Sequence, residues 1–501
     1  MAILNSLITY VFIATALFYA FTFSFRVLLH PLRKFPGPFV ACLSEAYGGF
    51  YAIKKCLHLQ TYKNHLKYGP VVRQGPDRLV FNSATALQTI YQNEAITKSY
   101  VYAVAQPDQH NIFTTTDKSE HRPKRKLISQ VLSDHSMRRF ESTMAEQIDV
   151  FLGRLLQSDS SPINMTPACR KLGLNIAGLL GFGYDLELQT DNTHIFLTDA
   201  ITFGNYRVNT CMQFTPLARL KPGPIMDLFP NSLRARLMDA KHDLLSVFTD
   251  QSDLDIKNLK QQSLWTDAVF FFAAGGETIA SSLAAAFFYL SRNSSCYEKL
   301  ATEIRTTFRS GREISSGSRL SGCRYLRACI DEALRMSPPV PGILWREATP
   351  GIKDKPLVID DHVIPSGTQV GVSIYSLHHN EEYFPDPFEF QPERWLVGTK
   401  SSRAAAQAAF KPFSIGSRGC AGKTMAYLEI SLVLAKTLWY FNFQRTSSVC
   451  KKDLGSGISR VTQGLATENE FPIYDVFAAS HDGPTLEFHP RDSLCDELTR
   501  F

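Results

Sequence analysis

The sequence lacks the spacings and charge runs that mark several common classes of protein. None of its ten cysteines forms a Cys-x-x-Cys pair, which argues against zinc ribbons, iron–sulfur cages and thioredoxin-like redox pairs. The net charge of +6 is mild and the basic residues are scattered along the 501 positions, so nothing predicts nucleic-acid binding. Mostly free thiols in a reducing compartment are the simplest interpretation of the cysteines.

Charge is also missing near the N-terminus. The stretch from Leu4 to Phe25 contains no charged residue, and basic residues follow it directly. This length suffices for a helix that spans a bilayer, and the positive charges after it predict that the rest of the chain stays cytosolic. A cleaved signal peptide is the alternative, but no basic residue precedes the run and the run is too long. We therefore expect a membrane anchor over 1–30 and one large domain over 31–501.

One cysteine stands in a glycine-rich loop. Residues 413–423 read Phe-Ser-Ile-Gly-Ser-Arg-Gly-Cys-Ala-Gly-Lys, with Cys420 near the centre. Gly416 and Gly419 permit tight turns, and apolar residues recur at helical spacing after Ala421. Cys420 is thus predicted at the mouth of a helix, where the dipole lowers a thiol pKa and favours the thiolate. Such a thiolate suits metal or haem ligation, or nucleophilic chemistry.

A second landmark runs from Leu264 to Leu290, where Glu277 is the one charged residue after Asp267. A second membrane span is one interpretation. However, Gly275-Gly276 weakens a helix in mid-run, and an acid at the centre of a membrane would be costly. We expect a core helix whose small residues let a ligand approach the backbone. Glu277 beside Thr278 can deliver protons, and a satisfied core pair is the alternative.

The remaining sequence is mainly helical, with short strands. His121 and Arg125 lie four residues apart on one face of a basic helix. A solvated surface is one interpretation of that face, and a clamp for carboxylates is another. Residues 100–116 lack periodicity and predict a loop over a cavity. The tail from Val449 onward predicts short strands and loops, including Asp475–Phe477 and Leu486–Phe488. The expected fold class is mainly α with small β-sheets (α+β).

Four motifs then stand in one order along the chain. They are Ala274-Gly275-Gly276-Glu277-Thr278, Glu332-Ala333-Leu334-Arg335, Pro392-Glu393-Arg394-Trp395 and Phe413-x-x-Gly416-x-Arg418-x-Cys420-x-Gly422. In this combination the chain, from the anchor onward, resembles the cytochrome P450 family of haem-thiolate monooxygenases. It looks like the microsomal eukaryotic type and is closest to fungal members that modify secondary metabolites. The resemblance implies the cytochrome P450 fold, preceded by one N-terminal transmembrane helix.

The resemblance also implies roles for individual residues. Cys420 would be the axial thiolate of the haem iron, and Glu277 and Thr278 would deliver protons while dioxygen is activated. Contacts to the haem propionates would come from His121, Arg125, Arg346 and Arg418. A structural network of Glu332, Arg335 and Arg394 would lock the preceding segment beneath the cysteine loop.

The implied reaction inserts one oxygen atom of O2 into a hydrophobic small molecule, by hydroxylation, epoxidation or multistep oxidation. The cofactor would be haem b, and electrons would come from NADPH through NADPH–cytochrome P450 reductase, with cytochrome b5 as a further partner. The substrate would be a terpenoid or polyketide intermediate of a fungal secondary-metabolite pathway. The protein would be anchored in the endoplasmic reticulum membrane with its catalytic domain on the cytosolic side.

Reductase docking is expected on a basic face that includes Arg122, Lys124, Lys126 and Lys423, because basic residues suit an acidic flavin domain. Three alternatives to the monooxygenase remain from the sequence. They are an O2-independent haem-thiolate isomerase or dehydratase, a non-enzymatic haem-binding protein, and a membrane scaffold with two spanning helices and no haem.

Overall fold

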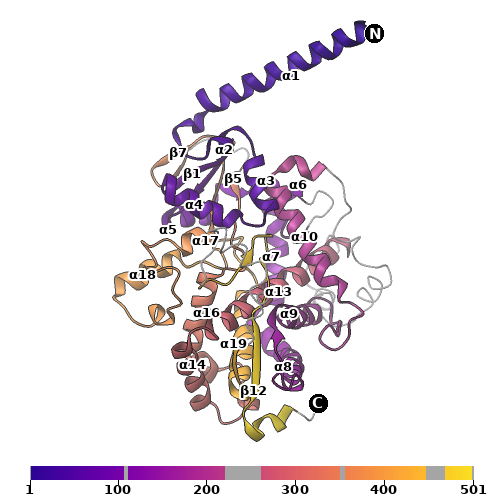
Figure 1. Ribbon diagram of the computed structural model, residues 1–501, viewed down its shortest axis with the longest axis vertical. Coiled ribbons are helices and arrows are strands. Elements are labelled where there is room, and N and C mark those ends of the chain that lie inside the picture. The colour runs from indigo at the N-terminus through magenta and orange to yellow at the C-terminus, as the bar shows by residue number, and fades with distance from the viewer. Residues whose placement is uncertain (1, 106–110, 220–260, 350–355, 447–468, 499–501) are drawn as a thin grey trace.

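The computed structural model describes residues 2–105, 111–219, 261–349, 356–446 and 469–498. Helices dominate and the strands are short (Figure 1), which confirms the expected fold class. The α-helices are α1 (Ala2–Leu28), α2 (Phe39–Leu43), α3 (Ala46–Ile53), α4 (Leu57–Tyr68), α5 (Ala84–Gln92), α6 (Val101–Ala105), α7 (Lys118–Val131), α8 (Asp134–Gln157), α9 (Met165–Phe182), α10 (Phe196–Gln213), α13 (Gln261–Leu290), α14 (Ser294–Thr307), α15 (Ser318–Gly322), α16 (Arg324–Met336), α17 (Ile374–His378), α18 (Lys400–Ala409) and α19 (Lys423–Tyr440). Short 3-10 helices are η1 (Pro31–Lys34), η2 (Thr215–Arg219), η5 (Gly311–Glu313), η6 (Pro392–Trp395) and η7 (Asp492–Leu498).

The strands form one larger sheet and three small ones. They are β1 (Val71–Gly75), β2 (Arg78–Phe81), β3 (Ile96–Lys98), β4 (Ile163–Asn164), β5 (Arg346–Ala348), β6 (Leu357–Ile359), β7 (His362–Ile364), β8 (Gln369–Val372), β9 (Phe441–Arg445), β10 (Ile473–Tyr474), β11 (Ser480–His481) and β12 (Thr485–Pro490). The larger sheet has the order β1-β2-β8-β5-β3. Most of its labelled strands lie at the end of the molecule from which α1 projects (Figure 1).

Helix α13 crosses the middle of the helical layer and packs along α9 (Figure 1). Its candidate membrane-spanning window is 67% buried inside the protein, which confirms the core-helix interpretation. Glycines make the packing close, because a Cβ on Gly276 would lie 2.3 Å from Leu174 Cδ2, and one on Gly173 would lie 2.8 Å from the Gly276 carbonyl oxygen. Gly276 therefore serves helix packing, whereas Ala274 and Gly275 line a cavity, which confirms for these two the expectation that small residues let a ligand approach the backbone.

Helix α1 projects away from the folded body (Figure 1). Residues Ile3–Leu28 are long and apolar enough to cross a membrane, and none of the window is buried inside the protein. A helix that exposes mostly apolar side chains is unfavourable in water but stable in a bilayer.

The predicted Glu-Arg-Arg network is confirmed. Glu332 accepts hydrogen bonds from Arg335 Nη2 at 2.9 Å, from Arg394 Nε at 2.9 Å and from Trp395 Nε1 at 3.0 Å. Arg335 also donates to the carbonyl oxygens of His378 and Pro387. The network joins α16 to η6 and to the segment that leads toward the cysteine loop, and both Glu332 and Arg335 are fully buried.

The tail contains short strands and a connecting turn, as expected. Leu486–Phe488 lies in strand β12, whereas Asp475–Phe477 lies in the turn between β10 and β11, because the ladder ends at Tyr474, which pairs with Ser480. The backbone of Phe477 has φ of +80°, a conformation incompatible with an extended strand.

Candidate active site

A cavity of about 290 Å³ lies beside the cysteine loop. It collects the residues that the sequence placed far apart, and these are Lys98, Tyr102, Ile112, Phe113, His121, Arg125, Phe270, Thr278, Arg346, Arg418, Cys420, Glu429 and Phe477, among others. Tyr102, Ile112 and Phe113 contribute to its wall, so the prediction of a cavity beneath the 100–116 segment is confirmed for the described part of that segment.

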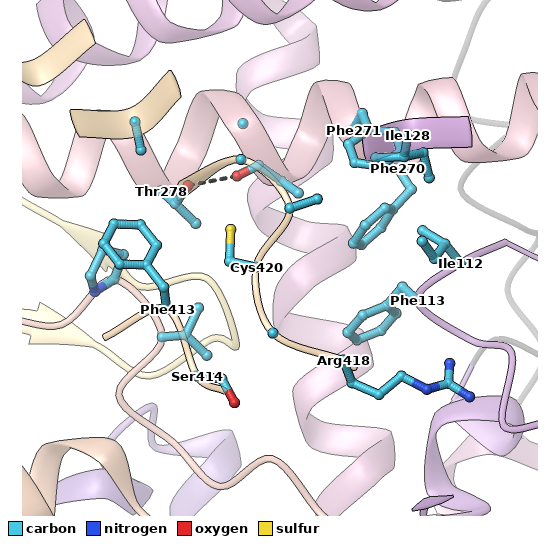
Figure 2. A pocket seen from close by; sticks show the side chains of 18 of the residues that line it. Ile112, Phe113, Ile128, Phe270, Phe271, Thr278, Phe413, Ser414, Arg418 and Cys420 are labelled. Carbon is cyan, nitrogen blue, oxygen red and sulfur yellow. Dashed lines mark hydrogen bonds between the residues drawn. The ribbon is translucent and has the colours of Figure 1, made fainter. Parts of the chain in front are cut away.

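The cysteine loop is shaped by a glycine that no other residue could replace easily. Gly416 has φ of +75°, and a Cβ there would lie 2.0 Å from the Tyr91 carbonyl oxygen. The loop closes on itself through a 2.9 Å hydrogen bond from the Cys420 N–H to the Phe413 carbonyl. Figure 2 shows the Cys420 sulfur turned into the cavity, toward the helix that carries Thr278.

Cys420 lies at the mouth of α19, as predicted, but its pKa does not follow the prediction. Burial raises the pKa of the Cys420 thiol, and the Gly422 N–H and the charges of Arg125 and Lys423 oppose that effect without reversing it. The side chain is nevertheless accessible, because its open side faces the cavity. A cation bound on that side is what would favour the thiolate.

The four predicted propionate contacts all line the cavity. Arg418 donates to the carbonyl oxygens of Thr115 and Thr116 at 2.7 and 3.0 Å, and Arg125 donates to that of Gly419 at 2.6 Å. Burial and the surrounding cations lower the pKa of His121 to about 3, so its imidazole is neutral. The solvated-surface interpretation of this helix face is therefore wrong for His121, which is 6% exposed.

Lys98 is a fifth member of this group that the sequence did not reveal. It is buried, it donates to the Phe113 carbonyl at 2.5 Å, and desolvation with the charges of Arg346 and Arg418 lowers its pKa well below the usual value. The β3–β5 ladder sets Lys98 directly opposite Arg346. Like charges directly opposite each other on neighbouring strands are destabilising. In the sequence, the position of Lys98 shortly before the 100–116 segment was a weak indication that it would reach the cavity.

Lys98, Arg125, Arg346 and Arg418 form what we call the open cation cluster. Among the described residues, none of the four has a carboxylate oxygen within 4.0 Å. Buried positive charges are costly unless an anion faces them. The cluster is therefore suited to a ligand that carries carboxylates and enters the cavity.

The structure separates the predicted acid–alcohol pair. Thr278 lines the cavity and its hydroxyl donates to the Ala274 carbonyl at 2.7 Å (Figure 2). Glu277 instead accepts from Arg170 on α9, at 3.0 Å from Nε and 2.9 Å from Nη2. Burial raises the pKa of Glu277 while Arg170 opposes the shift. Thr278 thus faces the cavity, and Glu277 lies at the junction between α9 and α13.

A different acid, Glu429 of α19, lines the cavity. It is 1% exposed, its Oε1 atom has no hydrogen-bond partner, and burial raises its pKa to about 8. At neutral pH the carboxyl group is therefore mostly protonated. The sequence signal was weak, because Glu429 stands between apolar residues of a helix whose buried face only tertiary packing reveals.

Lys124 does not belong to the docking face on which the sequence analysis placed it. Its ammonium lies 2.7 Å from Asp267 Oδ2, and the side chain is buried. Asp267 Oδ1 also accepts from the Ile112 N–H at 2.6 Å, so the pair fixes the wall of the cavity. Lys124 is not available to a partner protein, whereas Arg122, Lys126 and Lys423 are exposed.

The comparisons with known proteins agree with this geometry. The family model described as Cytochrome P450 matches residues 34–467. The cytochrome P450 monooxygenase poxM of Penicillium oxalicum is 32% identical over 491 residues, covering 93% of this chain and 91% of the relative. The cytochrome P450 monooxygenase AKT7 of Alternaria alternata is 32% identical over 497 residues, covering 93% and 94%. The cytochrome P450 monooxygenase apf7 of Gibberella fujikuroi is 30% identical over 514 residues, covering 93% and 95%.

Proposed function

We propose that this chain, which belongs to the cytochrome P450 family, is a membrane-anchored monooxygenase with Cys420 as the iron ligand of haem b. The reaction inserts one oxygen atom of O2 into a hydrophobic small molecule, with electrons from NADPH. One observation carries the proposal. The open cation cluster and the accessible sulfur of Cys420 face the same cavity, so that cavity suits one ligand with both carboxylates and a thiolate-binding metal.

The residues fit haem at both ends of that cavity. Arg346, Arg418 and Lys98 would bind the propionates by charge-assisted hydrogen bonds, with His121 and Arg125 beside them. Cys420 would bind the iron, and the hydrogen bond from the Gly422 N–H would lower the electron density on the sulfur. When bound, thiolate-ligated haem supplies the iron on which dioxygen is cleaved.

Thr278 and Glu277 of α13 are the groups that would supply protons to a ligand in the cavity. The Thr278 hydroxyl is within the cavity wall and holds its proton toward the Ala274 carbonyl. Rotation of that hydroxyl would make the proton available to a ligand in the cavity. Glu277, the preceding residue of α13, is held by Arg170 of α9. Its carboxyl group would replace that proton.

The apolar wall supports a lipophilic substrate. Apart from Thr278, the cavity residues contributed by α9 and α13 are alanine, glycine, leucine, isoleucine and phenylalanine. Such a surface favours ligands with large apolar area and few polar groups. A terpenoid or polyketide intermediate of a fungal secondary-metabolite pathway fits this description, and hydroxylation, epoxidation or multistep oxidation would all be compatible with it.

The expected setting follows from the anchor. We infer that residues 1–30 hold the catalytic domain, residues 31–501, at the cytosolic face of the endoplasmic reticulum membrane. NADPH–cytochrome P450 reductase, with cytochrome b5 as a second donor, would then reach the exposed residues Arg122, Lys126 and Lys423. The exposed apolar surface of α1 supports the anchoring part of this proposal.

Two measurements on the full-length protein test the proposed function. The carbon monoxide adduct of the reduced protein should show the red-shifted Soret band of thiolate ligation, and Cys420→Ser should lose it. Co-expression with a reductase should then give NADPH-dependent oxygen consumption and products heavier by one oxygen atom. If the protein shows a normal thiolate spectrum but isomerises or dehydrates its substrate without oxygen uptake, the O2-independent isomerase or dehydratase would be favoured instead. A haem spectrum without any turnover would favour a binding protein.

A further inference from the structure

The turn between β10 and β11 brings an aromatic side chain into the cavity. Phe477 lines the cavity wall and has φ of +80°, in a region that residues with a Cβ seldom adopt. Strained backbone of this kind persists only where the surrounding structure fixes it, and it is concentrated at ligand sites.

The turn is fixed on both sides by hydrogen bonds to other elements. On one side Asn209 Nδ2 donates to the carbonyl and to Oδ1 of Asp475, both at 3.0 Å, and the Asp475 N–H donates to the Lys55 carbonyl at 2.9 Å. On the other side the Ala479 N–H donates to the Pro339 carbonyl at 2.7 Å, and its carbonyl accepts from Ser281 at 2.6 Å. Phe477 sits midway between these two ties.

The side chain of Phe477 completes an aromatic wall. Its ring meets that of Phe113 edge to face, with centroids 5.0 Å apart and planes at 79°. Phe113 in turn stacks on Phe270, at 5.2 Å and 17° (Figure 2 shows these two rings). All three residues line the cavity, and they come from three segments far apart in the sequence.

Helix α10 is the element that ties this wall to the rest of the protein. Asn209 is 3% exposed. Its neighbours Val208, Cys211 and Met212 pack in one apolar cluster with Tyr102, against which Phe113 and Phe477 also pack. A shift of α10 would therefore move Asp475, and through it the ring of Phe477.

We propose that Asn209 and Asp475 are positioning residues that hold Phe477 in the wall, and that this wall selects ligands which present a flat unsaturated ring to Phe113, Phe270 and Phe477. The selection is expected because aromatic rings gain edge-to-face and stacking contacts that a saturated ring of similar size does not. The inference rests on the proposed function, since the ligand would lie between this wall and haem.

The test uses a pair of azoles of nearly equal size that bind haem iron. Full-length holoprotein is titrated with 4-phenylimidazole and with 4-cyclohexylimidazole, and Kd is read from the Soret shift. The wild type should prefer the phenyl compound. Phe477→Leu should reduce that preference about 2- to 12-fold, the size expected for one aromatic pair. Asn209→Ala should reduce it in the same direction by a smaller factor.

Three controls separate positioning from general damage. Imidazole alone, which is too small to reach the wall, should bind all variants equally. Thr210→Ala is the matched control on α10, because the Thr210 hydroxyl donates within the helix, to the Tyr206 carbonyl. This variant should leave the preference unchanged. Asn209→Ala combined with Phe477→Leu should give no further loss beyond Phe477→Leu, since Asn209 acts through that ring.

The outcomes are distinct. Equal weakening of both azoles by Asn209→Ala, or an unchanged preference in Phe477→Leu, overturns the inference. Should Asn209→Ala fail to retain haem, Asn209→Ser is titrated in its place and judged by the same two criteria. If the wild type binds none of the azoles at iron, the proposed haem site itself is wrong, which is a separate failure.

Discussion

Two groups of buried and partly buried cations in the described part of this protein differ in whether the chain supplies the negative partner. Arg335 and Arg394 face Glu332 at 2.9 Å, and the remaining donors of Arg335 reach backbone carbonyls. The open cation cluster of Lys98, Arg125, Arg346 and Arg418 has no such carboxylate among the described residues. The first group is closed within the fold, whereas the second is left open toward a cavity.

This difference separates structural charges from ligand-binding charges. A buried ion pair whose hydrogen bonds are all made adds little net stability, but it becomes very costly when one partner is removed. An open group of like charges is costly as it stands and is relieved when an anion binds. Substitutions in the two groups should therefore have opposite effects on the protein without its cofactor.

The largest effect is expected in the closed group. Arg335→Ala leaves Glu332 buried with one cation fewer and should cost about 3–5 kcal/mol of folding free energy, enough to give poorly folded protein without haem. Expression level, thermal unfolding and the carbon monoxide spectrum measure it. Arg319→Ala is the matched control, since its pair with Glu313 is exposed and should be worth less than about 1 kcal/mol. Normal haem content in Arg335→Ala would remove the structural role.

A second effect should appear as a pH dependence at Glu429. Burial raises its folded pKa to about 8, so the stability is greatest at low pH and is lost as the pH rises from the unfolded pKa toward the folded one. Between pH 6 and pH 9 the wild type should lose about 3 kcal/mol more than Glu429→Gln, which cannot ionise. Thermal or urea unfolding of both proteins at the two pH values measures this, and parallel pH profiles would contradict it.

Replacing one lysine from each kind of site should change the stability of the apoprotein in opposite directions. Lys98→Gln keeps a donor for the Phe113 carbonyl but removes a cation from the open cluster, so the apoprotein should become more stable. The holoprotein should lose haem about 10- to 100-fold faster, because one charged hydrogen bond of roughly 1.5–3 kcal/mol is missing. Unfolding of the apoprotein and haem transfer to an acceptor protein measure the two effects.

Lys436→Gln is the matched variant of a closed pair. Lys436 lies 2.6 Å from Asp149 and is largely buried, so its loss should destabilise the apoprotein and leave the rate of haem loss nearly unchanged. If Lys98→Gln behaved like Lys436→Gln in both measurements, the distinction between open and closed cations would fail.

The sequence was sufficient where a motif is local. The turn at Gly416, the helix after Cys420, the apolar core helix and the Glu332–Arg335 pair all follow from residues within a few positions of one another. The fold class followed from the same periodicities.

The sequence was insufficient where packing between distant segments decides the position of a side chain. Lys98 meets Arg346 through the pairing of β3 with β5, which no local pattern specifies. Glu277 turns to Arg170 because α9 packs against α13, and the same packing uses Gly276. The turn at Asp475–Phe477 is held by hydrogen bonds from Asn209 to Asp475 and from Ser281 to Ala479, which join segments far apart in the sequence.

The smallest effect is expected for exposed charges that have no partner role in either group. Arg122 and Lys126 are exposed on α7, and replacing both by glutamine should slow reductase-driven reduction about 2- to 5-fold at low ionic strength, since exposed charges steer association weakly. The difference should vanish as salt screens the interaction. Stopped-flow reduction across a salt series measures it, with Lys67→Gln on α4 as the exposed control. A slowing that persists at high salt would mean that these residues act through the fold, as the buried Lys124 does, and not through docking.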